Sequence, residues 1–276
     1  MVIDMSLFRL DLRPGNGRRL TGGARYRELL GRDLLRFLIV NLLTILGFLP
    51  LIAGVAYAIL SSSVLILIPA CIISGMIAGP AAACMHDTIL RSLRDAPGRL
   101  TENYKRALSQ NWRQALVPGI IFSLMLGFYA FMLMLLWWSE TSPGWGTIAL
   151  LLFGMLLFFM FFSVYWQLLV LFDHPQKQRI LNCLLFIIKF FWKVFFCALQ
   201  QILYWTVLIL FMPLSLILLP FTGIWFILFT ADFKLYDTMN EMFNIEKQIA
   251  EAFPEQEVIY EDDEAWLKRK QEEMRN

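Results

Sequence analysis

Two pairs of a histidine and an aspartate are the residues of this chain best suited to acid–base or metal chemistry. The pairs are His86-Asp87 and Asp173-His174, and each stands at the end of a long apolar run. Imidazole nitrogens and carboxylate oxygens are zinc ligands, so the four groups could hold a metal if the two helix ends met. Polar residues also gather where a helix leaves a membrane. We favour this simpler explanation and expect neither a metal nor another cofactor.

The other sequence signs of an enzyme are missing. The chain has no P-loop, HExxH motif, nucleophile elbow or Gly-rich nucleotide loop. Its four cysteines are thirteen or more residues apart and form no CxxC pair, which is a poor pattern for disulfides or zinc. We therefore expect buried, reduced thiols at Cys71, Cys84, Cys183 and Cys197. An enzyme is the least favoured class of function.

The elements that carry these residues are long apolar segments. Hydrophobic residues make up 58% of the chain and its mean hydropathy is +0.61, whereas a soluble domain is typically about 45–50% apolar. Six apolar runs are each about as long as, or longer than, the roughly 20 residues that cross a bilayer core. They are Leu34–Leu60, Val64–Ile89, Leu116–Trp138, Gly146–Phe172, Val194–Met212 and Leu214–Phe233. The predicted fold is an all-α polytopic membrane protein with six transmembrane helices and interfacial amphipathic helices.

The basic residues predict how these spans are oriented. When the spans are threaded alternately, three connections lie on one side: Ser61–Ser63, Ser139–Gly146 and Pro213. None of the three contains Lys or Arg, and Glu140 is their only charge. All 24 Lys and Arg residues then fall on the other side. The positive-inside rule places that side, and both termini, in the cytoplasm.

We expect three regions along the chain. Residues 1–33 form a basic cytoplasmic arm that favours anionic lipid headgroups, residues 34–235 form the transmembrane domain, and residues 236–276 form an acidic cytoplasmic tail. The tail includes the charge cluster Glu261–Glu264. No aromatic or Gly-rich surface accompanies the basic arm, so we do not expect nucleic-acid binding.

Small residues in the second span predict close helix packing. Gly75, Gly79, Pro80 and Ala83 lie along one stretch of it. Glycine and alanine let another helix approach closely within a membrane, and proline frees a backbone carbonyl that neighbours must satisfy. We expect a central, bent helix whose small-residue surface packs against a partner protein. Pro220 and Gly223 similarly predict an interruption of the last span.

Three further segments have amphipathic patterns. Residues 101–115 place Tyr104 and Trp112 on one stripe, with Arg113 off it. A helix lying on the inner membrane surface explains this pattern, and a docking helix for a cytoplasmic partner is the alternative. Residues 180–192 predict a half-buried interfacial helix before the fifth span. Residues 236–249 predict an amphipathic continuation of the last span.

One family resembles this chain across residues 34–235. Gly79-Pro80-Ala81-Ala82-Ala83, the basic turn with Arg91 and Arg94, and Tyr104–Leu108 followed by Asn111–Gln114 are similar to the YesL-like small bacterial membrane proteins. The length and the number of spans fit this family as well. The resemblance implies no defined activity. It implies a bacterial cytoplasmic-membrane protein whose gene often lies beside genes for carbohydrate ABC importers.

These observations favour a non-enzymatic accessory or regulatory subunit associated with carbohydrate uptake. Its expected partner is a sugar permease of the ABC class or a membrane sensor. The alternative is a self-contained transporter, or an ABC permease subunit, for small neutral solutes such as sugars. The central parts of the six predicted spans contain no Asp, Glu, Lys, Arg or His, which disfavours proton-coupled transport. No glycine lies between Thr101 and Val117, which disfavours the ATPase-coupling loop of ABC permeases.

Overall fold

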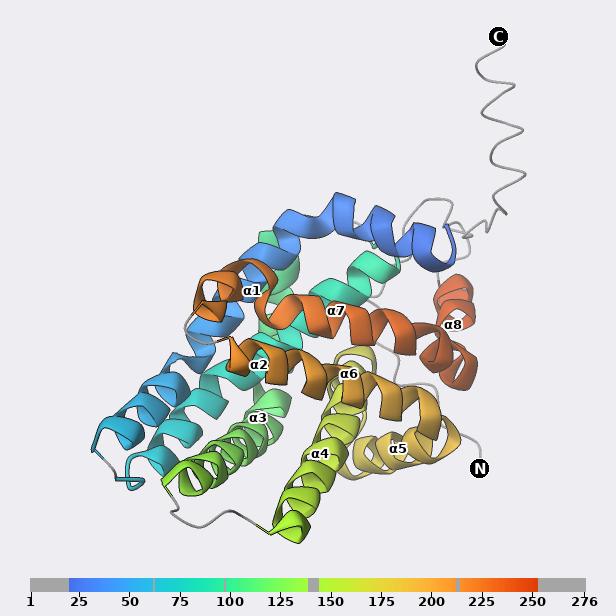
Figure 1. Cartoon of the computed structure of the whole chain (residues 1–276). Coiled ribbons are helices and arrows are strands. Elements are labelled where there is room, and N and C mark those ends of the chain that lie inside the picture. Colours follow the sequence, from blue (N-terminus) through green and yellow to red (C-terminus); the bar gives the residue numbers. More distant parts are fainter. Residues whose placement is uncertain (1–19, 62, 97, 139–143, 212–213, 253–276) are drawn as a thin grey trace.

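Eight helices form the part of the chain that the structure describes, a computed structural model covering residues 20–61, 63–96, 98–138, 144–211 and 214–252 (Figure 1). They are α1 (Gly22–Ser61), α2 (Leu67–Leu93), α3 (Leu100–Trp138), α4 (Trp145–Leu171), α5 (Gln176–Lys189), α6 (Phe191–Leu210), α7 (Ser215–Phe243) and α8 (Ile245–Ala252). Six of them, α1–α4, α6 and α7, are long and apolar enough to cross a membrane. The predicted all-α polytopic class is confirmed.

Helix α1 is longer than expected. The last part of the predicted basic arm, from Gly22 onward, is continuous with the first span in one helix of 40 residues. Its first half packs on α7, where the Phe37 ring stacks on Trp225 with centroids 5.4 Å apart. Its second half packs on α2, where Ser74 donates a hydrogen bond to the Gly47 carbonyl. Figure 1 shows the helix, in blue, bending between these two contacts.

Helix α2 is the central helix of the bundle, as the sequence predicted. It contacts α1, α3, α4 and α7. Of its most apolar 18-residue segment, 67% is buried, whereas the corresponding segments of the other five candidate spans are at most 39% buried. It continues through Pro80 as a single α-helix. Large apolar side chains are exposed on the outside of the bundle, among them Leu35, Leu150 and Leu203. This distribution is that of a protein whose solvent is lipid.

Helix α3 differs from the expectation for residues 101–115. These residues are the first turns of the same 39-residue helix that forms the third span, which continues through Pro118. The reason is tertiary: Ala115 and Gly119, on either side of Pro118, lie against the backbone of α2. This contact favours a continuous helix where the sequence predicted two separate ones.

The fifth span is preceded by a separate helix, as predicted. The break lies at Phe190, whose backbone angles of φ −118° and ψ 37° are not helical. It comes earlier than expected, so Trp192 and Lys193 belong to α6. The buried side chains of α5, among them Cys183 and Phe186, face the bundle, while Leu181 and Ile188 on the opposite face are exposed.

The predicted amphipathic continuation of the last span over residues 236–249 is confirmed as far as Phe243, and the rest of that segment lies in a separate helix, α8. Helix α7 runs past residue 235, the expected end of the transmembrane domain, and buries Tyr236, Met239 and Phe243. Asn244 ends it in the left-handed conformation (φ 49°), which asparagine tolerates better than most residues. Helix α8 then folds back and buries Ile249. The acidic cluster Glu261–Glu264 and most of the basic arm lie outside the described residues.

Candidate functional site

The small residues of α2 form a helix contact inside the chain. A Cβ atom built on Gly75 would lie 2.4 Å from Ile120 Cα, and one on Gly79 would lie 2.6 Å from the Ala115 carbonyl oxygen. Both neighbours are backbone atoms of α3, and Gly119 is the matching small residue there. The surface that we expected to face a partner protein at Gly75 and Gly79 therefore faces α3. The sequence did carry this signal, because Ala115 and Gly119 are spaced four residues apart as Gly75 and Gly79 are.

Pro80 and Ala83 are likewise buried within the chain. Ala83, which is fully buried, belongs to the main hydrophobic core together with Phe162 and Phe229. The glycine contact and this core hold α2 and α3 together as a unit. The exposed face of α3 is therefore presented on a firmly packed helix.

The first turns of α3 divide the predicted docking residues between two faces. Tyr104 is partly buried, and its backbone carbonyl accepts a hydrogen bond from the Cys84 thiol of α2. Trp112 is 43% exposed, with Leu108 beside it one turn earlier. The Arg113 guanidinium lies 5.2 Å from the centre of the Trp112 ring, a cation–π contact. Trp112 and Arg113 thus form an exposed aromatic and basic surface, whereas Tyr104 serves the internal packing.

The two His–Asp pairs of the sequence have separate partners. Asp87 accepts a hydrogen bond from Arg91 on the same helix, at 3.1 Å. Asp173 accepts one from Gln114 at 2.8 Å, and the His174 ring stacks on Phe172 with centroids 5.3 Å apart. Among the described residues, no group of three or more His, Cys, Asp or Glu side chains could hold a metal ion. The two pairs do not combine into the zinc site considered above.

His86 instead contacts the carboxylate of Asp232 on α7. Its Nδ1 atom lies 2.7 Å from Oδ2 of Asp232 on α7, and both side chains are 1% exposed. The Trp166 ring of α4 stacks on the imidazole, and the Gln167 amide interacts with the carboxylate. An ionisable pair therefore lies inside the bundle, near the predicted ends of the second and last spans. The expectation that the centres of the spans carry no titratable side chain does not cover these two positions. The available signal in the sequence was that Asp232 interrupts the apolar run Leu214–Phe233.

Helix α7 is discontinuous at the position that its proline and glycine predicted. Gly223 has φ −34° and ψ −114°, outside the helical region. The side chain of Asn41 on α1, which is fully buried, completes the hydrogen bonds of the break: its Nδ2 donates to the carbonyls of Leu219 and Pro220, and its Oδ1 accepts from the N–H groups of Ile224 and Trp225.

A second helix also supports this break. The hydroxyl of Tyr204 on α6 donates to the carbonyls of Thr222 and Gly223, at 2.7 and 2.8 Å. Irregular backbone at membrane depth requires such partners, because lipid offers none. Sequence reasoning missed both Asn41 and Tyr204. A lone asparagine within an apolar run was the available signal for the first.

Charged residues join α1 to the end of α2. Asp95 follows α2 in the left-handed conformation (φ 56°) and accepts hydrogen bonds from Arg25 and Arg32. Buried Asp33 accepts a hydrogen bond from Ser92 at 2.6 Å. Burial alone would raise the pKa of Asp95, but the hydrogen bonds and charges of Arg32 and Arg25 outweigh it and lower that pKa. We call this part of the molecule the charged end.

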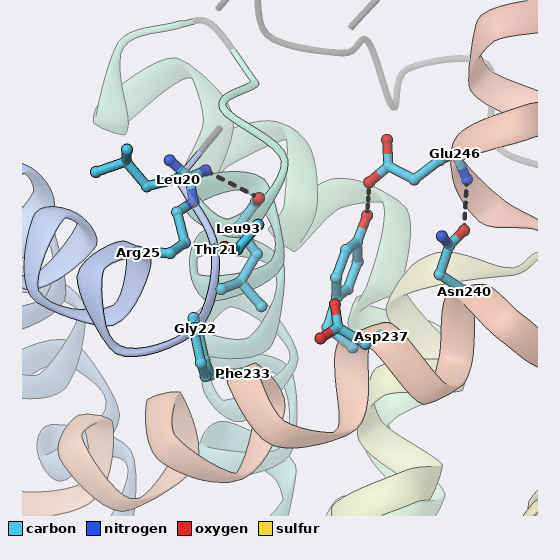
Figure 2. A pocket seen from close by; sticks show the side chains of 10 residues that line it. Leu20, Thr21, Gly22, Arg25, Leu93, Phe233, Asp237, Asn240 and Glu246 are labelled. Atoms are coloured by element: carbon cyan, nitrogen blue, oxygen red, sulfur yellow. Dashed lines mark hydrogen bonds between the residues drawn. The ribbon is translucent and has the colours of Figure 1, made fainter. Parts of the chain in front are cut away.

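A small pocket opens at the charged end (Figure 2). It has a volume of about 130 Å³ and lies between the start of α1, the end of α2, α7 and α8. Arg25 lines it, and its guanidinium donates to the Leu93 carbonyl. On the opposite wall, Glu246 accepts from Tyr236 while its N–H donates to Asn240. Hydrogen bonds therefore join α1 to α2 on one wall of the pocket and α7 to α8 on the other.

Comparison with protein-family models, curated proteins and solved structures finds no match to this chain. Three features of the structure bear on function: an exposed Trp–Arg surface on α3, a break in α7 that two side chains support, and a buried His–Asp pair.

Proposed function

We propose that this chain is a non-enzymatic integral membrane protein that acts as an accessory or regulatory subunit. Its orientation in this proposal follows the positive-inside rule, with the charged end and both termini in the cytoplasm of a bacterial cell. The partner binds the exposed face of α3 at Trp112 and Arg113. The YesL-like resemblance supports a carbohydrate ABC permease or a membrane sensor as that partner.

The observation that carries this proposal is the exposure of Trp112 and Arg113 on a tightly held helix. Trp and Arg are among the residues most enriched at binding hot spots. A rigid surface also loses little conformational entropy on binding. The close contact between Gly79 of α2 and Gly119 of α3 supplies that rigidity.

A pull-down from native membranes tests the proposal. The tagged wild-type chain and Trp112→Ala are purified in mild detergent, and co-purifying proteins are quantified by mass spectrometry. Loss of a hot-spot tryptophan typically costs at least about 2 kcal/mol, or roughly thirtyfold in affinity. Trp145→Ala is the matched control, because Trp145 is 86% exposed at the start of α4, outside the proposed surface. The proposal fails if a partner co-purifies equally well with wild type and Trp112→Ala.

The second candidate is a self-contained transporter of small neutral solutes. The break in α7 favours it, because discontinuous membrane helices commonly form the binding sites of secondary transporters. Asn41 and Tyr204 hold the backbone of this break in place, so a binding site formed there depends on both side chains. Uptake by the purified chain alone, reconstituted in liposomes, separates the two candidates. An accessory subunit leaves the vesicle contents unchanged, whereas a transporter fills the vesicles and loses this activity in Asn41→Ala.

A further inference from the structure

The contact between His86 and Asp232 has a feature that neither helix packing nor docking requires. Two ionisable groups touch at 2.7 Å in a position where each is 1% exposed. They join α2 to the part of α7 that follows its break. The Nε2 atom of His86 has no hydrogen-bond partner among the described residues. The imidazole thus contacts a carboxylate through one nitrogen and keeps the other available.

The charged groups on the surrounding helices are engaged elsewhere. On α2, Asp87 binds Arg91; on α1, Asp33 binds Arg32 and Ser92; on α7 itself, Lys234 binds Gln200 of α6. Arg94, which is fully buried, interacts with Tyr236, Arg91, Asp87 and Glu246. From α4 the pair faces the neutral Gln167 and Trp166, and from α6 the Cys197 thiol interacts with Asp232. His86 is therefore the only partner among these groups that can neutralise the Asp232 carboxylate.

The total charge of the pair follows from this burial. A carboxylate beside a neutral imidazole would leave one uncompensated negative charge in a medium of low dielectric constant, where an unpaired charge is very unfavourable. One additional proton makes the pair neutral, whether as imidazolium and carboxylate or as imidazole and carboxylic acid. In both arrangements Nε2 carries a hydrogen, and the second proton lies between Nδ1 and Oδ2.

We propose that His86 and Asp232 form a buried proton-binding site, which holds this additional proton at neutral pH and is electrically neutral. The ligand is the proton itself, shared between α2 and α7. Its release would place a net negative charge between the two helices and weaken their contact. The site is independent of the Trp112 surface, so either proposal can fail without the other.

Magnetic resonance of isotopically labelled histidine tests the site directly. The chain has two histidines, so His174→Gln leaves His86 as a single signal whose two nitrogen shifts report its protonation. The sample is the full chain in nanodiscs at neutral pH. We expect either an imidazolium that is lost in Asp232→Asn, or a neutral imidazole with its hydrogen on Nε2.

Infrared spectroscopy of the carboxyl groups completes the test in the second case. A neutral imidazole must then coincide with a protonated carboxyl band that disappears in Asp232→Asn. Asp232→Glu, which retains the acid, moves that band and covers the case in which the asparagine variant fails to fold. A neutral His86 with Asp232 fully ionised in the wild-type chain would overturn the proposal.

Discussion

Replacing Gly79 by alanine tests whether the backbone contact between α2 and α3 holds the bundle together. The added Cβ would lie 2.6 Å from the Ala115 carbonyl oxygen and 2.7 Å from Gly119 Cα. Ordinary van der Waals contact begins at 3.4 Å. Both neighbours are backbone atoms, so neither can rotate away. The two helices must therefore separate by about 0.8 Å, and each adjacent contact loses roughly a quarter to a half of its dispersion energy.

We expect this separation to destabilise the protein by about 1–3 kcal/mol, the usual cost of overpacking a tight interior. Gly31→Ala is the matched control, since a Cβ at Gly31 in α1 meets no atom within 4 Å. Alanine exceeds glycine in helix propensity by about 1 kcal/mol, so this control should be neutral or stabilised. The assay is unfolding of both variants in the same detergent, followed by circular dichroism.

The contact also predicts a coupling between the two helices. Gly119→Ala removes space from the same contact. Once one variant has separated the helices, the second adds little, so the double variant should lose less unfolding free energy than the two single variants together. Equal stability of Gly79→Ala and Gly31→Ala would refute the reasoning. It would mean that α2 and α3 do not approach as closely as the backbone positions indicate.

Two further perturbations address the break in α7 and the charged end. Asn41→Leu removes the hydrogen-bond partners of four backbone groups and should lower the free energy of unfolding by more than about 2 kcal/mol. Tyr204→Phe should lower it by about 1 kcal/mol. Equal losses in the two variants would show that Asn41 does not hold the break. The lowered pKa of Asp95 means that its contribution to stability is complete above about pH 4, the ordinary carboxyl range, and is lost as the pH falls through the lowered value. The stability difference between wild type and Asp95→Asn should therefore be constant near neutral pH and shrink in acid, and a difference that does not change in acid would contradict the Arg25 and Arg32 contacts.

The sequence by itself determined the class of the fold and the number of helices that can cross a membrane. It also predicted the interruption at Pro220 and Gly223, the separate helix before the fifth span and the amphipathic continuation after residue 235. Each of these features is local. Hydropathy, span length and helix-breaking residues act within about 20 residues of chain, and lipid permits few alternatives to a helix.

The tertiary structure decided which of these residues meet. His86 and Asp232 are 146 residues apart, and Asn41 is 178 residues from Leu219. Their contacts depend on how each helix is rotated and at what height it packs, which no local pattern specifies. The same reason explains why the small residues at Gly75 and Gly79, correctly expected to allow close packing, face α3 rather than a partner. Hydrophobicity placed the helices in the membrane, and backbone-to-backbone fit with a few buried polar pairs determined their arrangement.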